Sequence, residues 1–316
     1  MSTTVTAPPT SSSLQPSPGS GMRKFKNRLA TTLIYATVGV ALVPLVWLLW
    51  TVISKGGQAI TRNGWWTQSQ RGLTYKDPGG GAFHAILGTL EEVALCAVIS
   101  VPIAILVAIY LVEYGHGLLA RVTTFMVDIL TGVPSIVAAL FIYAVFLATL
   151  GGQFAGVYAS LALVLLMVPV VVRTTEEMLK LVPNELREAS YALGIPKWKT
   201  IVKIVIPTAF TGITTGVVLG VARVAGETAP LLVLVKYTPN VNGNLFSGFQ
   251  ASLPLMIREQ VGNLGSSFGL DANGNQVAIR NYAPDRMWGA ALTLIIIVMA
   301  LNLFARFVGR FNKVAD

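Results

Sequence analysis

A charged pair stands inside an otherwise apolar stretch of the sequence. Arg223 and Glu227 lie four positions apart within "VARVAGETAPLLVL" (221–234). Four positions are about one helical turn, so the two side chains can meet on one face of a helix. A guanidinium offers a planar fork of donors that suits phosphate-like oxyanions, and the glutamate can neutralise it between binding events. A permanent Arg223–Glu227 ion pair, or a link from Arg223 to a neighbouring helix, is the alternative interpretation.

A second arginine closes a different apolar run. Arg173 is followed one turn later by Glu176 and Glu177. It is a second candidate for contact with an anion. The alternative is an arginine that extends its head group to the membrane surface and pairs with Glu177 four positions on. Asp128 is a weaker candidate, for which helix packing or a local hydrogen bond is the simpler interpretation.

Enzymatic and metal chemistry have little support in the sequence. His84 and His116 fall on opposite sides of a predicted span, and Cys96 lies in an apolar run. No Ser/His/Asp or Cys/His arrangement occurs, and no G-x-x-x-x-G-K-[ST] phosphate loop is present. We therefore predict no catalytic residue, no metal site and no cofactor held by this chain.

The elements that carry these residues are predicted to be membrane-spanning helices. The chain has 316 residues, of which 53% are hydrophobic and only 12% are charged, whereas soluble domains carry about 25% charged residues. A span needs about 20 apolar residues. The sequence predicts an all-α integral membrane protein, with residues 1–22 as a disordered Ser/Thr/Pro-rich tail and residues 23–316 as one transmembrane domain. Six segments qualify as spans: about 29–53, 87–112, 122–149, 156–175, 208–235 and 287–308.

The distribution of Lys and Arg predicts the orientation. Fourteen of the 23 lie on the side that holds both termini, and eight lie in the two longer loops, 54–86 and 236–286. Because basic residues favour the cytoplasmic side, both termini are expected in the cytoplasm. Contact with anionic lipid then accounts for the net charge of +9, and no nucleic-acid partner is predicted.

A polar segment separates the fourth and fifth predicted spans. In residues 176–207, Asn184 can cap a helix and Glu185 suits its first turn. Gly194 stands where a helix end favours a left-handed residue, and Pro196 suits the start of a second helix. The pattern predicts a short helix–turn–helix that lies across the cytoplasmic face. An interfacial amphipathic linker without a partner is the alternative.

This segment resembles the EAA loop of ABC-importer permeases. The matching positions are Glu188, Ala189, Gly194, Ile204 and Pro207. Ser190 and Ile206 depart mildly from the family pattern. In that family the loop docks into a cleft of the ATPase subunit, and the resemblance implies the same for residues 185–199. The residues implied to couple to the ATPase are Glu185, Glu188, Ala189, Gly194, Pro196, Lys197 and Pro207.

Further stretches resemble the PstA family, one of the two permease subunits of phosphate-specific ABC transporters. They are 100–115, 131–143, 170–194 and 221–234, and the resemblance covers about 29–312. It implies a type I importer (MetI-like) fold in the bacterial inner or plasma membrane, and it supports a role for Arg173, because such permeases carry an arginine at the matching position. Glu91 and Glu92 depart from the family pattern.

The resemblance also implies partners. They are a homologous, PstC-like permease, a PstB-like ATPase dimer that binds ATP and Mg, and an external PstS-like phosphate-binding protein. Three alternatives remain open: an importer of another oxyanion such as molybdate or sulfate, an ATP-independent anion channel or secondary transporter, and a purely structural membrane subunit.

Overall fold

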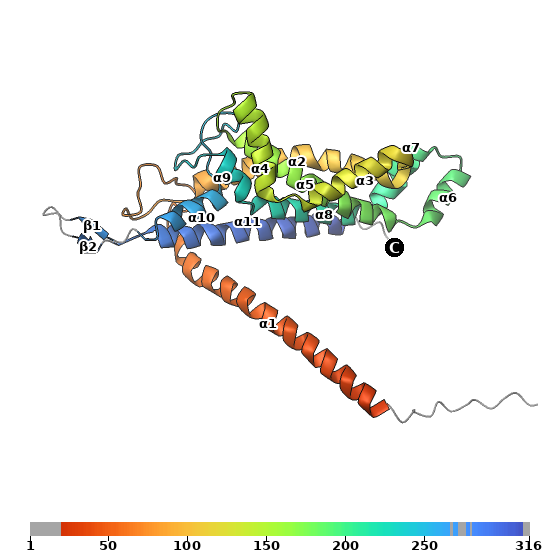
Figure 1. Cartoon of the computed structure of the whole chain (residues 1–316), viewed down its shortest axis with the longest axis horizontal. Helices are drawn as coiled ribbons and strands as arrows, with labels where there is room; N and C mark the ends of the chain where they lie inside the picture. Colours follow the sequence, from red (N-terminus) through yellow and green to blue (C-terminus); the bar gives the residue numbers. More distant parts are fainter. Residues whose placement is uncertain (1–19, 266–267, 271–275, 279, 312–316) are drawn as a thin grey trace, which may run out of the picture. The chain divides into compact units, whose positions relative to one another are not determined.

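The structure is a computed structural model that describes residues 20–265, 268–270, 276–278 and 280–311 (Figure 1). The chain divides into two compact units, residues 1–51 and 52–316, and each is described by itself. Residues 1–19 of the predicted tail lie outside the described residues. Residues 20–22 belong to the first turn of helix α1 (Ser20–Ile60), so the predicted tail boundary at residue 22 is too late.

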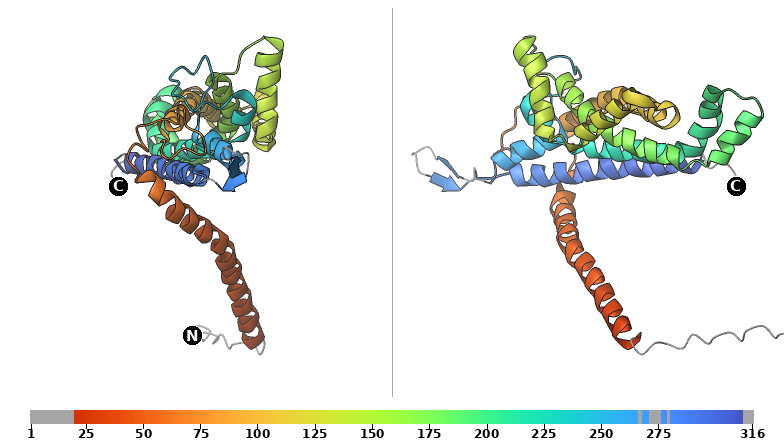
Figure 2. Two further views of the ribbon diagram at one scale, coloured as in Figure 1. Left: turned by 90° about the vertical axis from the view of Figure 1, so that its left-hand side faces the viewer. Right: turned by 45° about the vertical axis from the view of Figure 1, so that its right-hand side comes forward.

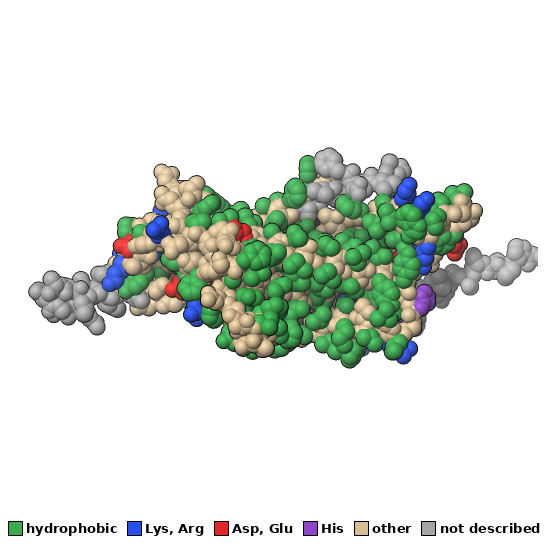
Figure 3. All heavy atoms as spheres, turned by 90° about the horizontal axis from the view of Figure 1, so that it is seen from above, with side chains coloured by type: hydrophobic (Ala, Val, Ile, Leu, Met, Phe, Trp, Pro, Cys, Tyr) green, Lys and Arg blue, Asp and Glu red, His purple; other side chains and the backbone are tan. Residues whose placement is uncertain are grey.

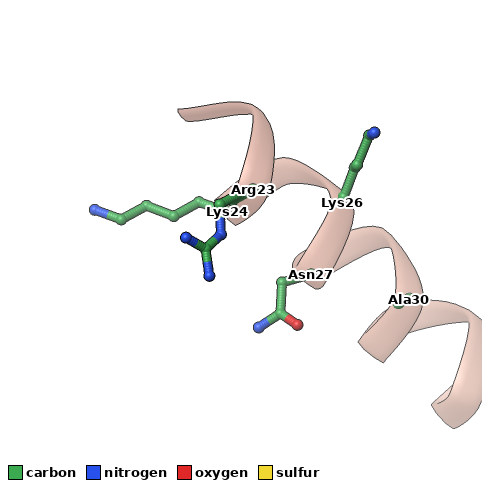
Figure 4. Close-up of a pocket in the computed structure, with 5 residues that line it drawn as sticks. All are labelled: Arg23, Lys24, Lys26, Asn27 and Ala30. Atoms are coloured by element: carbon green, nitrogen blue, oxygen red, sulfur yellow. The ribbon is translucent and has the colours of Figure 1, made fainter. Parts of the chain in front are cut away.

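The described residues of the first unit, 20–51, form the exposed, apolar part of α1. Its large side chains are open, with Trp47 and Trp50 each more than two thirds exposed. Three basic side chains, Arg23, Lys24 and Lys26, surround its first turns (Figure 4). A helix that is apolar along most of its length and basic at one end has the pattern of a membrane span with a charged anchor.

The second unit is mostly helical, which confirms the predicted all-α membrane fold (Figures 1 and 2). Its strands, β1 (Phe268–Leu270) and β2 (Gln276–Ala278), form one antiparallel pair with Phe268 opposite Ala278. Its helical elements, in chain order, are α2 (Phe83–Ile109), η1 (Tyr110–Tyr114), α3 (Gly117–Gly132), α4 (Ser135–Ile142), η2 (Tyr143–Thr149), α5 (Gly156–Lys180), α6 (Asn184–Ala192), α7 (Lys197–Thr200), η3 (Ile201–Val205), α8 (Ile206–Ala225), α9 (Ala229–Leu234), α10 (Leu253–Gly262) and α11 (Ala283–Phe311).

Five helices within the described residues are long and apolar enough to cross a membrane. They are Gly21–Ile60, Phe83–Tyr114, Gly156–Lys180, Lys197–Ala225 and Ala283–Phe304. A sixth candidate is the pair Gly117–Gly132 and Ser135–Thr149, which is bent by 107°. On the face seen in Figure 3, apolar side chains cover the middle and charged side chains gather toward the two ends, as expected for a protein that crosses a bilayer.

Two predicted spans are interrupted. The segment 122–149 breaks at Val133–Pro134, since proline lacks the amide that would continue the helix. The segment 208–235 breaks after Ala225, and α9 begins only at Ala229. The short helices that follow the two breaks, α4 and α9, pack against each other around Ala139, Ile142, Leu231 and Leu234.

Helix α5 lies at the centre of the second unit, between α2 and α8. A stripe of three glycines on α8, at positions 212, 216 and 220, faces α5. A Cβ on Gly212 would lie 2.2 Å from Met178 Sδ, and one on Gly216 would lie 2.4 Å from Thr174 Oγ1. Small residues at this spacing let two helices approach closely where lipid supplies no hydrophobic driving force.

The loop between α1 and α2 is held from inside. The side chain of Arg286 is buried and donates to the main-chain oxygens of Thr74, Asp77 and Gly79 at 2.7–3.0 Å. The amide and the hydroxyl of Thr74 both donate hydrogen bonds to the Asp77 carboxylate. These bonds, that of the amide first, lower the pKa of Asp77. The loop is thus an ordered cap on this end of the helices.

Trp65 in this loop is buried inside the protein, against α11. It is only 1% exposed, and its Nε1 donates to Thr293 Oγ1 of α11 at 2.9 Å. A buried indole needs a partner for its N–H, and Thr293 supplies it. Trp66 alone is partly exposed, at 44%.

Candidate functional site

Arg223 lies at the end of α8, two residues before the helix stops. Its side chain is 57% exposed, and its Nε is 4.0 Å from Glu227 Oε1. Glu227 is outside the helix, in the break between α8 and α9, so the predicted pairing along a continuous helix is corrected to a loose contact across a helix end. A 4.0 Å separation is at the limit of an ion pair and leaves guanidinium donors free for another partner.

Arg173, in contrast, is held tightly. Its guanidinium contacts Asp128 of α3, and its Nη1 donates to Glu176 Oε2 at 2.7 Å. Lys180 donates to the other oxygen of Glu176 at 2.6 Å. The predicted alternative pairing with Glu177 is wrong. Arg173 pairs instead with Glu176 and with Asp128, which is 45 positions away in the sequence.

The structure does not bring the two arginines together. Antiparallel packing sets Gly216 of α8 beside Thr174 of α5, next to Arg173. Arg223 is seven residues further along α8, which corresponds to about 10 Å of helix. The two candidates therefore occupy different levels of the helical bundle.

The polar segment between α5 and α8 projects at one end of the second unit (Figure 2). Gly194 connects α6 to the following turn with φ +73°, which confirms the predicted left-handed residue. The amide of Ile195 donates to the Ser190 oxygen at 3.1 Å, and the amide of Gly194 to the Tyr191 oxygen at 2.9 Å, which closes the helix end. Asn184 is the first helical residue and Pro183 is the cap, one position earlier than predicted.

The second helix of this segment differs from the prediction. α7 begins at Lys197, after Pro196 as its cap, and it runs through η3 into α8 as one continuous helix. It is therefore the first part of a spanning helix and not a separate element on the surface. The buried hydroxyls of Ser190 and Thr200 lie 2.7 Å apart and join the two arms of the turn.

Most of the predicted coupling residues are on the surface. Pro207 is the exception, since it is half-buried in the first turn of α8. Large apolar side chains around the turn are also open, with Trp198 59% and Leu193 79% exposed. Apolar side chains clustered on the tip of a polar loop indicate a protein contact surface. The exposed predicted residues are Glu185, Glu188, Ala189, Gly194, Pro196 and Lys197.

The structure adds functional residues to those predicted from the sequence. Glu113, at the end of the second span, is buried and binds Arg187 of α6. The glycine stripe on α8 has a sequence signal, G-x-x-x-G-x-x-x-G over 212–220, which could have been read. Glu113 has no such signal, because its partner is 74 positions away.

Glu91 and Glu92 both have defined surroundings. Glu91 Oε2 accepts from Gln250 Nε2 at 2.7 Å, and Glu92 is only 1% exposed. Both lie near the start of α2, where the segment before α10 packs on it. At the same end, burial and the nearby Glu259 raise the pKa of Tyr237, whose ring lies edge-on to His84. The two glutamates therefore belong to the packing between α2 and the segment before α10.

Comparison with known proteins places the chain in a family. Residues 100–312 match the family model described as "Binding-protein-dependent transport system inner membrane component". The chain is 54% identical over 286 residues to "Phosphate transport system permease protein PstA 1" of Mycobacterium tuberculosis (strain CDC 1551 / Oshkosh), which covers 90% of this chain and 89% of the relative. It is 38% identical over 289 residues to "Phosphate transport system permease protein PstA" of Pasteurella multocida (strain Pm70), covering 90% and 94%.

Solved structures share the fold. A bacterial alginate ABC transporter, crystallised with an alginate pentasaccharide-bound periplasmic protein, aligns with a TM-score of 0.62 at 14% identity, covering 94% of this chain and all of the other. The inward-facing MetNI methionine ABC transporter aligns with a TM-score of 0.52 at 18% identity, covering 74% and 94%. With these relatives and this fold, the chain belongs to the PstA family of permease proteins within the binding-protein-dependent transport system inner membrane components.

Proposed function

We propose that this chain is the membrane-spanning permease subunit of an ATP-driven importer that carries phosphate into a bacterial cell. The relatives that share more than half of its residues over most of its length are named phosphate transport system permeases. The observation in the structure that supports an anion as the cargo is Arg223. Its guanidinium is exposed on a helix of a membrane protein and is only loosely paired.

An exposed arginine on a spanning helix is costly if it faces lipid. Even lenient insertion scales assign about 2.5–3.5 kcal/mol to such a charge. The cost disappears if Arg223 faces a watery path between this chain and a second permease. There the guanidinium would contact phosphate oxygens transiently, and Glu227 would neutralise it between transport cycles.

Arg173 has a conditional role in this proposal. Because Asp128 and Glu176 already occupy its guanidinium, an anion could replace them only when α3 and α5 shift relative to each other. We place Arg223 first on the substrate path, and Arg173 as a site that opens during the transport cycle.

The partners follow from the family. An importer permease of this kind works with an ATPase and a substrate-binding protein. We propose a homologous PstC-like permease across the path, a PstB-like ATPase dimer at the α6–α7 turn, and a PstS-like phosphate-binding protein at the opposite end. ATP and Mg would be bound by the ATPase, and this chain would hold no cofactor.

The proposed location is the bacterial inner or plasma membrane, crossed several times with both termini in the cytoplasm. The basic side chains at the start of α1 and around the α6–α7 turn support this orientation. Residues 185–199 would then face the ATPase, and the loop held by Arg286 would face outward.

Uptake of labelled phosphate by cells that depend on this transporter tests the proposal. We expect Arg223→Gln to lower uptake by about tenfold to a hundredfold, since it removes charge-assisted hydrogen bonds worth about 1.5–3 kcal/mol. Unlabelled phosphate should compete with the label, and sulfate and molybdate should not. Arg121→Gln is the matched control, because Arg121 is exposed on α3 and has no ion pair within the described part of the chain.

Each alternative predicts a different result. Strong competition by sulfate or molybdate would favour another oxyanion. Uptake that persists after ATP depletion would favour a channel or secondary transporter. Normal uptake by Arg223→Gln would contradict the site assignment and favour a structural role.

A further inference from the structure

Glu113 is a buried carboxylate at the end of α2 where the helix joins the polar segment. Its residue is 6% exposed, and it lies in the five-residue π-helix η1. A buried carboxylate is destabilising unless charged or polar partners surround it. Its partners in the structure come from the segment between α5 and α8, which we propose to contact the ATPase.

The first partner is Arg187 of α6. Its Nε and Nη2 donate to Glu113 Oε1 at 3.1 and 2.9 Å. The same guanidinium donates to the main-chain oxygens of Val182 at 2.7 Å and Leu179 at 3.0 Å. Arg187 therefore ties α6 to the ends of both α2 and α5.

The second partner is Lys197, the first residue of α7. Its Nζ donates to the main-chain oxygen of Glu113 and lies 4.8 Å from the centroid of the Tyr114 ring. The two helices on either side of the Gly194 turn are thus both fastened to one residue of η1. We call the contacts of Arg187 and Lys197 with Glu113 the Glu113 clamp.

Two π-helical segments adjoin the clamp. η1 contains Glu113, and η3 follows α7 directly. Single turns of π-helix within α-helices often mark functional positions, because their hydrogen bonds are wider and can change register. A displacement of α6 and α7 would therefore be passed to α2 through η1 and to α8 through η3, the segments of these helices that deform most easily.

The far end of α2 is also firmly attached. A Cβ on Gly88 would lie 1.8 Å from the Ala251 oxygen, and Thr89 Oγ1 accepts from the Leu253 amide at 2.8 Å. Between its ends, α2 packs along α5. One continuous helix thus connects the clamp with the segment before α10 at the opposite end of the unit.

We propose that Glu113 is a positioning residue that transmits movement of the ATPase-facing segment to α2, so that α2 moves together with α8 during transport. The α6–α7 turn is covalently joined to α5 and α8, but it reaches α2 only by packing and through the clamp. The inference rests on the proposed function in one respect, namely that an ATPase acts on α6. It does not depend on which anion is carried.

Hydrogen exchange on the full transporter in lipid nanodiscs tests the proposal without using the substrate. The complex is compared without nucleotide and with ATP trapped by vanadate. In the wild type we expect ATP to change amide exchange both in residues 184–192 and in residues 110–114. Glu113→Ala removes the two bonds from Arg187 to the carboxylate and leaves the bond from Lys197 to the main-chain oxygen. Because we assign the transmission to the carboxylate, the change in 184–192 should remain in this variant, whereas the change in 110–114 should fall by about tenfold.

A second readout compares transport with ATP use. We expect Glu113→Ala to lower the phosphate taken up per ATP hydrolysed by about tenfold, while Arg121→Gln leaves the ratio unchanged. If Glu113→Ala does not assemble, Arg187→Lys tests the same clamp, because lysine keeps the charge but lacks the fork that reaches Glu113 and two carbonyls. It should show the same loss at 110–114.

The outcomes separate the two proposals. An unchanged response at 110–114 in both clamp variants would overturn the role of Glu113. A wild-type complex in which ATP leaves 184–192 unchanged would overturn it as well. A complex that takes up no phosphate but shows the Glu113-dependent response would contradict the substrate assignment and support the clamp.

Discussion

Replacing Gly88 with alanine is expected to destabilise the protein by at least about 3 kcal/mol, the largest effect that we predict for a single methyl group. The added Cβ would lie 1.8 Å from the main-chain oxygen of Ala251. That oxygen belongs to the backbone, so no side-chain rotation can relieve the overlap. The segment before α10 would have to leave α2, and the bond from the Leu253 amide to Thr89 would be lost with it.

Thermal unfolding of the detergent-solubilised protein measures this effect, together with the amount that accumulates in the membrane. Gly57→Ala is the matched control, since a Cβ there meets nothing within 4 Å. Both changes gain about 1 kcal/mol of helix propensity, so their difference isolates the overlap. Equal unfolding temperatures for the two variants would contradict the close approach of α2 and Ala251.

Replacing Gly194 with valine is expected to lower ATP-driven uptake by at least tenfold while the protein still accumulates in the membrane. Gly194 has φ +73°, and a Cβ there would meet open space. The cost is therefore backbone strain alone, about 1–2 kcal/mol for an ordinary residue and more for a β-branched one. About 1.4 kcal/mol already lowers the equilibrium ratio of the native turn to other conformations tenfold.

Two further variants identify the cause of that loss. Gly151 has nearly the same backbone angle, φ +70°, and equally open space, but it lies in the loop before α5. Gly151→Val should therefore retain far more uptake than Gly194→Val, and Gly194→Asn should be milder because asparagine tolerates this conformation. Equal losses at positions 151 and 194 would show that the turn has no special role in coupling. An ATP-independent channel would lose little conduction in any of these variants.

Local features of the molecule could be predicted from the sequence. The positions of the membrane-spanning helices could be predicted from runs of apolar residues, because a span requires about 20 such residues in a row. The turn at Gly194 was predictable because only glycine adopts its conformation without strain. The break at Pro134 also has a local cause, the proline itself. The span was nevertheless predicted as one helix, because the mean hydropathy of a segment of about 20 residues hardly changes when it contains one proline.

Side-chain partners were less predictable. Arg173 has two glutamates within one turn, and spacing alone favoured Glu177, whereas the structure pairs it with Glu176 and with Asp128 from another helix. Arg223 and Glu227 were expected to share a continuous helix, but the helix ends between them. An ion pair predicted from four-residue spacing forms only if both residues lie in the same helix and no charged side chain from another helix lies closer.

The sequence by itself determined the membrane fold, the polar turn and the presence of two unusual arginines, since each depends on residues that are neighbours along the chain. Only the tertiary structure decided that Arg173 is tightly held while Arg223 is open, that Trp65 is buried, and that Glu113 fastens the turn to α2. Glu113 and Arg187 are 74 positions apart. Their contact follows from how α2, α5 and α8 pack together, and that packing depends on close approaches at glycines that hydropathy does not register.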